Sequence, residues 1–387
     1  MRIYLDYNAT APLLPEVIAT VSRVMLTTFG NPSSVHTFGQ QAKAEVDLAR
    51  AAVAALINAD PAEVVFTAGG TEADNLALRG AAEALAPTGR KHLLTSGIEH
   101  EAVLTTIRAL ERQGWSATIV PVGPTGVVSP AALAAAMRPD TALVSIMHAN
   151  NEIGTIQPIA ELAAIARSAG ALFHTDAVQS VGKIPVDAKA LGVDLLSLAG
   201  HKFGGPKGTG ALWIRRGVRL SATLTGGRQE RNRRAGTENV PALAGLGTAA
   251  QLAREKLPQT SDTAALRDRL EASVLESIPG TAVNGDRTRR VPNTSNISFD
   301  GIEAESLLIA LDLEGVAVST GSACSSGSLE PSHVLRAMGL PSGRARNSLR
   351  FSAGPGTTSS DIDFLIDVLP GLVTRLRRLG RPALATR

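Results

Sequence analysis

The sequence has little cysteine and few aromatic residues, and it has no long apolar run. Cys324 is the only cysteine among 387 residues, so no disulfide can form within the chain. No stretch of about eighteen consecutive apolar residues is present, which excludes a bilayer-spanning helix, and the first residues have no basic segment followed by an apolar one. We therefore expect a cytoplasmic protein with no membrane partner.

Aromatic residues make up only 3% of the chain, and the net charge is +3. The arginines are spread out apart from three short clusters at 228–234, 287–290 and 375–378. Binding to single-stranded nucleic acid combines basic grooves with aromatic side chains on which bases stack. The composition therefore favours solvated basic surfaces, and we expect no nucleic-acid partner.

Three widespread catalytic motifs are also missing. The sequence contains no G-x-x-x-x-G-K-[ST], no H-E-x-x-H and no C-x-x-C. A nucleotide hydrolase or a zinc enzyme has no support, and we expect no resident metal.

Apolar strand-like runs alternate with amphipathic helical segments up to about residue 255. This alternation is typical of an α/β fold with a mostly parallel sheet flanked by helices. Beyond it, long helical segments surround short strands such as TSNISF (294–299) and SLRFS (348–352), which predicts a smaller α+β domain. We expect a large domain over residues 15–257, and a small domain formed by residues 1–14 and 258–387.

Polar residues follow the predicted strands, where open parallel sheets bind ligands. Gly70 and Thr71 in TAGGTEADN open a helix whose amides could hold a phosphate, or they form an ordinary glycine turn with a threonine cap. His100 begins a helix after KHLLTS, and Asp176 ends the strand ALFHT. Either side chain could instead be a helix cap or, for the carboxylate, an ion-pair partner.

A glycine-rich turn between two apolar strands contains Lys202 in GHKFGGPKGTG. Such a lysine is usually solvated, but burial would make its amine nucleophilic. Pyridoxal phosphate requires a lysine for its aldehyde, an acid for its ring nitrogen and a helix N-terminus for its phosphate. Lys202, Asp176 and Thr71 are candidates for these three roles.

Cys324 lies in the small, polar stretch STGSACSSGS (319–328). A lone cysteine is more often a small buried hydrophobe. Here a short predicted strand at 316–318 is followed by glycines and serines that have little to pack, which indicates an exposed loop. A thiol in such a loop can reach a substrate or a partner protein.

Eight segments resemble, in order and across nearly the whole chain, the cysteine desulfurases of the class V aminotransferase family. They are YLDYNATAP, GNPSSVHTFG, TEADN, SIMHANNEIG, HTDAVQSVGK, GHKFGGPKGTG, RAGTENV and GSACSSGSLEPSHVLRAMG. The GSAC segment is similar to the branch with the longer catalytic loop. The resemblance implies a fold type I pyridoxal 5'-phosphate enzyme that is a homodimer. It also implies removal of sulfur from L-cysteine and its transfer to an acceptor such as an iron–sulfur scaffold protein.

The resemblance also implies a role for each matching residue. Lys202 would bond to the cofactor, and Cys324 would take the sulfur and could transiently ligate an iron–sulfur cluster. The other matches lie around the cofactor or the substrate: His100 as a catalytic residue on the ring, Asp176 at its nitrogen, Gln179 at its hydroxyl, Gly70, Thr71 and His201 at the phosphate, Thr237 at the phosphate from the other subunit, Asn150 at both cofactor and substrate, and Arg350 at the substrate carboxylate.

Three positions depart from the residues common in that family. Ala199 replaces a serine whose hydroxyl would also hold the phosphate, while Ala11 replaces threonine and Pro355 replaces arginine.

Two other functions share this pattern of site residues. A selenocysteine lyase would differ in substrate, and a non-catalytic pyridoxal-fold binding protein would release no sulfide, although the presence of both Lys202 and Cys324 argues against the latter.

Overall fold

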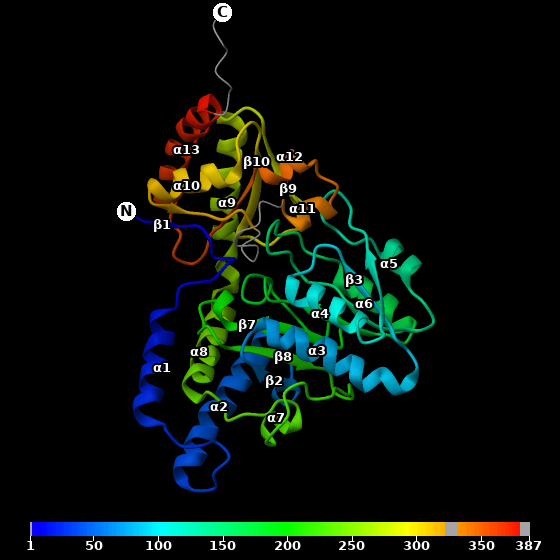
Figure 1. Cartoon of the computed structure of the whole chain (residues 1–387). Coiled ribbons are helices and arrows are strands. Elements are labelled where there is room, and N and C mark those ends of the chain that lie inside the picture. Colours follow the sequence, from blue (N-terminus) through cyan, green and yellow to red (C-terminus); the bar gives the residue numbers. More distant parts are fainter. Residues whose placement is uncertain (1, 322–330, 380–387) are drawn as a thin grey trace, which may run out of the picture.

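A computed structural model describes residues 2–321 and 331–379, so Cys324 lies outside the described residues. The lower lobe in Figure 1 is built on a seven-stranded sheet in the order β2-β8-β7-β6-β5-β3-β4. β8 runs antiparallel to both neighbours and the other pairs are parallel. The predicted α/β class is confirmed. The strands are β2 (Val64–Thr67), β3 (His92–Ser96), β4 (Ser116–Val120), β5 (Thr141–Ser145), β6 (Leu172–Asp176), β7 (Leu195–Ala199) and β8 (Gly210–Ile214).

Helices cover both faces of this sheet because successive apolar strand residues point to opposite sides. In β3, Leu93 packs with the helices α3 and α4, whereas Leu94 packs on the other face with α2, α6 and α8. Leu195 and Leu196 of β7 divide in the same way. The helices of this lobe are α1 (Pro15–Thr27), α2 (Thr37–Leu56), α3 (Gly70–Leu85), α4 (Glu101–Glu111), α5 (Pro130–Ala136), α6 (Ile159–Ser168), α7 (Gln229–Asn232) and α8 (Val240–Lys256), with short 3-10 turns at Pro61–Glu63, Ala86–Thr88 and Gly200–Lys202.

The upper lobe has its own apolar core and an antiparallel sheet in the order β12-β10-β9. A two-stranded parallel sheet joins β1 (Ile3–Tyr4) to β11 (Val316–Ala317), so the two ends of the chain share this core. The remaining elements are β9 (Thr281–Asn284), β10 (Thr294–Phe299), β12 (Ser348–Ser352), α9 (Thr260–Ser277), α10 (Ala304–Leu313), α11 (His333–Ala337), α12 (Ser342–Arg346) and α13 (Ser359–Leu379).

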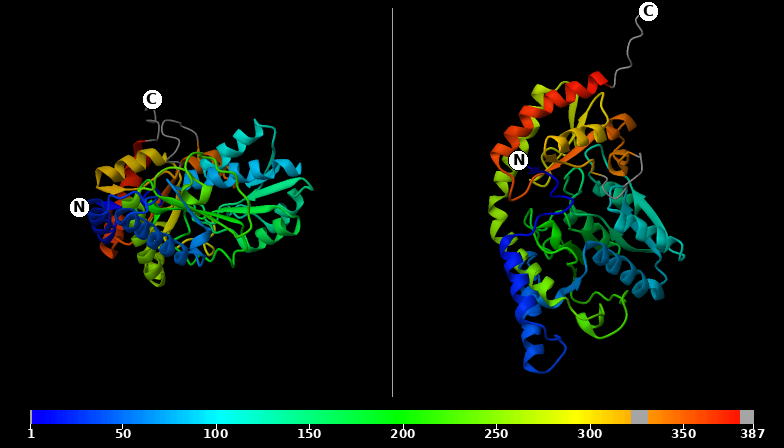
Figure 2. Two further views of the ribbon diagram at one scale, coloured as in Figure 1. Left: turned by 90° about the horizontal axis from the view of Figure 1, so that it is seen from below. Right: turned by 60° about the vertical axis from the view of Figure 1, so that its left-hand side comes forward.

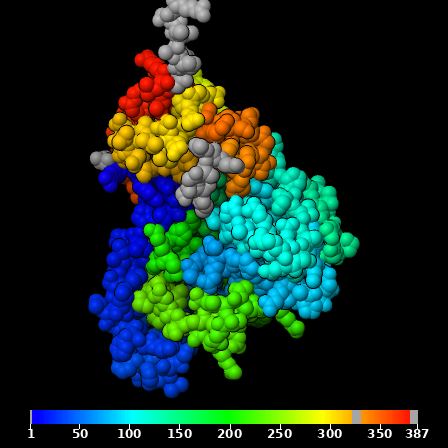
Figure 3. Space-filling model, viewed as in Figure 1, coloured from blue at the N-terminus to red at the C-terminus, as the bar shows by residue number. Residues whose placement is uncertain are grey.

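The lobes are joined along one side, where α8 and α9 follow one another with only the 3-10 turn Leu257–Gln259 between them (Figure 2, right). The N-terminal residues, blue in Figure 3, occupy the waist between the lobes. The domain boundaries stated above stay a prediction. Within residues 2–321 and 331–379, no helix is both long and apolar enough to cross a membrane.

Candidate active site

The predicted residues lie at the carboxyl ends of neighbouring strands. Asp176 is the last residue of β6, and Lys202 lies in the 3-10 turn Gly200–Lys202 that directly follows β7. His100 precedes α4 as its N-cap, and its Nδ1 accepts a hydrogen bond of 3.1 Å from the amide of Ala102. Burial lowers the pKa of His100, the charge of Asp176 raises it, and that of Lys202 lowers it, so the three groups influence one another electrostatically.

Asp176 lies among several buried carboxyl groups at this edge of the sheet. It is 5% exposed, it accepts a hydrogen bond of 2.9 Å from the amide of Val178, and burial raises its pKa. Burial also raises the pKa of Asp74 and raises that of Glu99 to about 8, and Asp176 adds to both shifts. A cation placed against Asp176 would offset the cost of keeping that carboxylate charged.

The N-terminal segment binds the amine of Lys202 through backbone oxygens. Its Nζ donates to the backbone oxygens of Asn8 and Ala9 at 2.7 and 2.9 Å. The Asn8 oxygen also accepts from Nε2 of Gln179 at 3.0 Å, while Oε1 of Gln179 accepts from Nζ of Lys183 at 2.6 Å. Asn8 thus links the partly buried Lys202 to the buried amine of Lys183 through neutral amide groups.

The start of α3 forms the other wall of the site. Helix α3 begins at Gly70 with Gly69 as its N-cap, so Thr71 is the second helical residue and not the cap. Amides in a first helical turn have no intrahelical partner. A Cβ at Gly70 would lie 2.7 Å from Cγ2 of Val178 and 3.5 Å from Cβ of Ala199, so a side chain at residue 199 faces this helix N-terminus.

His201 lies next to Lys202 in the same turn. Its Nδ1 is 3.1 Å from Oγ1 of Thr10. Burial, followed by the positive charges of Lys202 and Lys207, lowers the pKa of His201 to about 4. Its imidazole is therefore neutral at physiological pH and has a donor and an acceptor nitrogen.

This set of groups fits pyridoxal phosphate. It offers the Lys202 amine, the buried Asp176 carboxylate, whose raised pKa favours a nearby cation, and the His100 imidazole. It also offers the N-terminus of α3, where a Cβ on Gly70 would crowd Val178. These correspond to the needs of the aldehyde, the ring nitrogen, the ring face and the phosphate.

Asn150 and Arg350 are deeply buried. The amide of Asn150 donates to the oxygen of Ile98 at 2.9 Å and accepts from the amides of Glu152 and Ile153, so it shapes the loop after β5. Arg350 donates to the oxygen of Asn151 at 2.9 Å and to Oδ1 of Asp6 at 2.6 Å.

The two ends of the segment that contains Cys324 lie close together. Before it, Ser319 pairs with Arg350 in a short antiparallel bridge. After it, Oγ of Ser332 donates to Oε2 of Glu152 at 2.5 Å, and a Cβ at Gly321 would come 3.0 Å from that same oxygen. Both ends therefore meet at the Glu152 carboxyl group.

Thr237 lies in the connection between α7 and α8 and does not follow a strand of the sheet as most other candidates do. It is exposed, and it follows α7 and precedes α8. No cluster of three or more potential metal-ligating side chains occurs in the described part of the chain.

Sequence reasoning missed four buried polar residues at this site: Asn8, Glu99, His148 and Lys183. His148 is 5% exposed, its Nδ1 has no hydrogen-bond partner among the residues that the structure describes, and burial lowers its pKa to about 4. It follows β5 at the same sheet edge as Asp176, so the rule that led to the strand-end residues could have found it. Glu99 lies three residues after β3 and could have been found in the same way, whereas nothing in the local sequence distinguishes Asn8 and Lys183.

Comparisons with known proteins agree with this arrangement. The family model "Aminotransferase class-V" matches residues 3–365. A cysteine desulfurase IscS of Methanosarcina thermophila is 50% identical over 379 residues, which cover 98% of this chain and 93% of the relative. A solved NifS-like protein superposes with a TM-score of 0.91 at 35% identity, covering 97% of this chain and all of the other. A structure described as SspA in complex with cysteine superposes with a TM-score of 0.82 at 35% identity, covering 92% of this chain and all of SspA.

Proposed function

Because the chain belongs to the class-V aminotransferase family and is a pyridoxal-phosphate-dependent cysteine desulfurase, we propose that Lys202 bonds to the cofactor and that Cys324 receives the sulfur of L-cysteine. The observation that carries the proposal is the Lys202 amine, which two backbone carbonyls hold within electrostatic reach of Asp176 and His100.

Around the cofactor, Asp176 would face the ring nitrogen, His100 the ring and Gln179 the ring hydroxyl. Gly70, Thr71 and His201 would hold the phosphate. When bound, pyridoxal phosphate supplies a protonated ring that withdraws electrons from the α-carbon of the substrate. The buried Asp176 carboxylate would keep that ring nitrogen protonated, because each charge stabilises the other.

The chain's own groups would perform the remaining steps. The Lys202 amine would remove the α-proton as a general base. The guanidinium of Arg350, fixed by Asp6 and the loop at Asn151, would bind the substrate carboxylate together with Asn150. Such a fork of donors meets a carboxylate with two parallel hydrogen bonds.

Sulfur would then pass to Cys324. Its thiolate would attack the substrate sulfur: an S–S bond forms, the C–S bond breaks and the β-carbon takes a proton. Return of a proton from the Lys202 amine to the α-carbon would then give L-alanine. L-cysteine and one thiol thus give L-alanine and one persulfide. The persulfide would pass its outer sulfur to an acceptor protein such as an iron–sulfur scaffold. A cytoplasmic location stays a prediction.

We also infer a homodimer in which Thr237 completes the phosphate site of the partner subunit. An exposed apolar surface supports it: Leu26, Phe29, Val35 and Phe38 are 84%, 77%, 92% and 52% exposed. They lie on α1, at the start of α2 and in the connection between these helices. Large exposed apolar patches mark interaction sites.

Two variants test the residue roles. Lys202→Ala should lose the visible absorption of the bound cofactor and all sulfide release from L-cysteine, whereas Lys207→Ala, in the same turn, should keep both. Cys324→Ser should keep the absorption but form no persulfide in intact-mass spectra, because a hydroxyl is a far poorer nucleophile toward sulfur. Desulfurase activity in Lys202→Ala, or an added sulfur on Cys324→Ser, would refute the corresponding role. Parallel assays with L-cysteine and L-selenocysteine distinguish a cysteine desulfurase from a selenocysteine lyase.

A further inference from the structure

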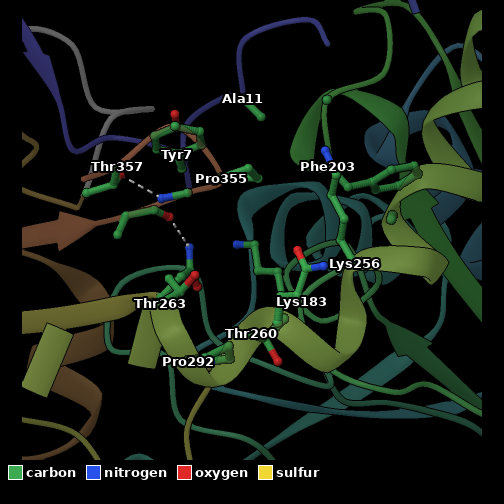
Figure 4. Close-up of a pocket in the computed structure, with 18 of the residues that line it drawn as sticks. Tyr7, Ala11, Lys183, Phe203, Lys256, Thr260, Thr263, Pro292, Pro355 and Thr357 are labelled. Atoms are coloured by element: carbon green, nitrogen blue, oxygen red, sulfur yellow. Dashed lines mark hydrogen bonds between the residues drawn. The ribbon is translucent and has the colours of Figure 1, made fainter. Parts of the chain in front are cut away.

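A cavity lies beside Lys202, where the N-terminal segment, the end of α8, the start of α9 and the residues after β12 meet. Its volume is about 500 Å³. Of the residues described at the candidate active site, Lys202 and Lys183 line it, whereas His100, Asp176 and Thr71 are not among the lining residues. Figure 4 shows Lys183 reaching toward the middle of this cavity from below, with Lys256 at its side.

The charged residues that line the cavity are predominantly cationic. Lys183, Lys202 and Lys256 contribute amines, and Asp262, an exposed residue, contributes the one carboxylate among the lining residues. Lys183 is only 7% exposed, and within the described residues no carboxylate lies within ion-pair distance of it. Its Nζ donates instead to the neutral oxygens of Asn8 and Gln179, at 2.7 and 2.6 Å.

The environment of Lys183 disfavours its charge. Burial lowers the pKa of Lys183 well below its usual value, and the positive charges of Lys202, from the turn after β7, and Arg350, from β12, lower it further. Lys256, Tyr7 and Asp262 face the same cavity from the other elements. An anion in the cavity would supply the missing negative charge and would favour a proton on Lys183.

The rest of the lining is apolar. Phe203, Leu14, Leu266 and Pro292 form much of the wall, and hydroxyl groups come from threonines of α9. Ala11 and Pro355, two of the positions that depart from the residues common in the family, also line the cavity, and both side chains are small. Pockets of this size with apolar walls and a few convergent polar groups are typical of small-molecule sites.

We propose that this cavity binds a small organic carboxylate with an apolar body, whose carboxylate lies between Lys183 and Lys256 and whose body packs against Phe203 and Leu266. An amino acid fits less well, because its ammonium group would face Lys183 and Lys256. Inorganic phosphate would leave the apolar walls without a partner. The proposal does not depend on the role of Cys324.

The test is isothermal titration calorimetry of the holoenzyme with 3-phenylpropanoate, the uncharged 3-phenylpropanamide and inorganic phosphate. We expect one carboxylate per chain, bound at least about tenfold more tightly than the amide or phosphate, because the charged hydrogen bonds carry the affinity. Titrations in buffers of different ionisation enthalpy should reveal proton uptake, so the affinity should fall as pH rises. Equal binding of the amide, or tighter binding of phosphate, would overturn the proposal.

Variants locate the ligand. Lys256→Glu should weaken binding at least about tenfold by reversing a charge in the lining, Thr263→Trp should block the cavity by its bulk, and Lys189→Glu, an exposed lysine outside the cavity, should bind as the parent does. Lys183→Met should abolish both carboxylate binding and proton uptake. If this variant fails to fold, Lys256→Glu and Thr263→Trp still test the location of the ligand. Saturating L-alanine should leave the affinity unchanged. Loss of binding with L-alanine, or unchanged binding in Lys256→Glu and Thr263→Trp, would place the ligand elsewhere and refute the site.

Discussion

Glu99 carries an electrostatic cost that depends on pH. It is fully buried, and its carboxyl oxygens accept hydrogen bonds from Ser96 and from the amide of Met147. Its folded pKa of about 8 lies above the ordinary 4.5, so the folded state binds this proton more tightly than the unfolded state. The contribution of Glu99 to stability is therefore most favourable below pH 4.5 and decreases as pH rises toward 8.

Glu99→Gln should remove this dependence, since an amide keeps an acceptor oxygen but cannot ionise. Relative to the parent, we expect the variant to gain on the order of 2 to 4 kcal/mol of unfolding free energy between pH 5 and pH 8. Urea unfolding at several pH values measures this difference. Glu101→Gln, on the neighbouring residue at the start of α4, is the control and should show no such gain. Parallel stability curves for Glu99→Gln and the parent would contradict the pKa argument.

The alanine at position 199 offers a test of the phosphate wall. Because its Cβ lies against the start of α3, Ala199→Ser would place a hydroxyl near the helix N-terminus. One added charge-assisted hydrogen bond is worth about 1.5 to 3 kcal/mol at most, and less where it displaces water. The serine variant should therefore retain pyridoxal phosphate longer during dialysis against a carbonyl-trapping reagent, with desulfurase activity unchanged. Equal retention would mean that residue 199 does not contact the phosphate.

At the level of single residues, the sequence was most informative where local pattern and chemistry coincide. Lys202 in its glycine-rich turn and Asp176 at the end of its strand lie as predicted. The unusual pKa values of Glu99 and Lys183 could not be recognised, because they arise from burial in the folded chain. Asn8 could not be recognised either, since its contacts to Gln179 and Thr294 exist only in the folded chain.

Elements with strong apolar alternation were predicted almost to the residue. TSNISF and SLRFS are β10 and β12, and the long helical segments of the C-terminal part are α9 and α13. The helices α1 and α2 were not predicted as elements. Their apolar residues are divided between the core and an exposed surface, which weakens the periodic signal that identifies a helix.

Two helical glycines should respond oppositely to the same substitution. A Cβ at Gly247 of α8 would lie 2.6 Å from Cα of Ala49 in α2, whereas a Cβ at Gly371 of α13 would meet nothing within 4 Å. Gly247→Ala should therefore destabilise the protein by about 1 to 3 kcal/mol through overpacking. Gly371→Ala should stabilise it by about 0.5 to 1 kcal/mol, because alanine loses less backbone entropy in a helix. Denaturation midpoints of the two variants and the parent decide this, and equal shifts would contradict the close packing of α2 on α8.

At the scale of the whole molecule, the aromatic pair Phe29 and Phe38 tests the homodimer. Their ring centroids are 5.0 Å apart, yet both side chains are mostly exposed. Sedimentation should give about twice the chain mass of 40.0 kDa for the parent. Phe29→Asp with Phe38→Asp should give single chains that bind pyridoxal phosphate weakly, because each would lack the partner's Thr237.

The matched control is Leu313→Asp, which also removes an exposed apolar side chain (81% exposed) but lies at the end of α10 in the upper lobe. This variant should remain a dimer. A parent that sediments as one chain, or a double aspartate variant that stays dimeric with full cofactor binding, would refute the interface.

The N-terminal strand has a consequence for the order of biosynthesis. Ile3 and Tyr4 pair with Val316 and Ala317, and the backbone that holds the Lys202 amine follows at once. A ribosome releases residues 3–9 first, but their strand partner emerges more than three hundred residues later. The lower lobe can fold during translation. The backbone oxygens that bind the Lys202 amine are fixed in place only when β1 pairs with β11, which requires a nearly complete chain. Cofactor capture should therefore be a late event of synthesis, and a nascent chain stalled before residue 316 should fold in part without retaining pyridoxal phosphate.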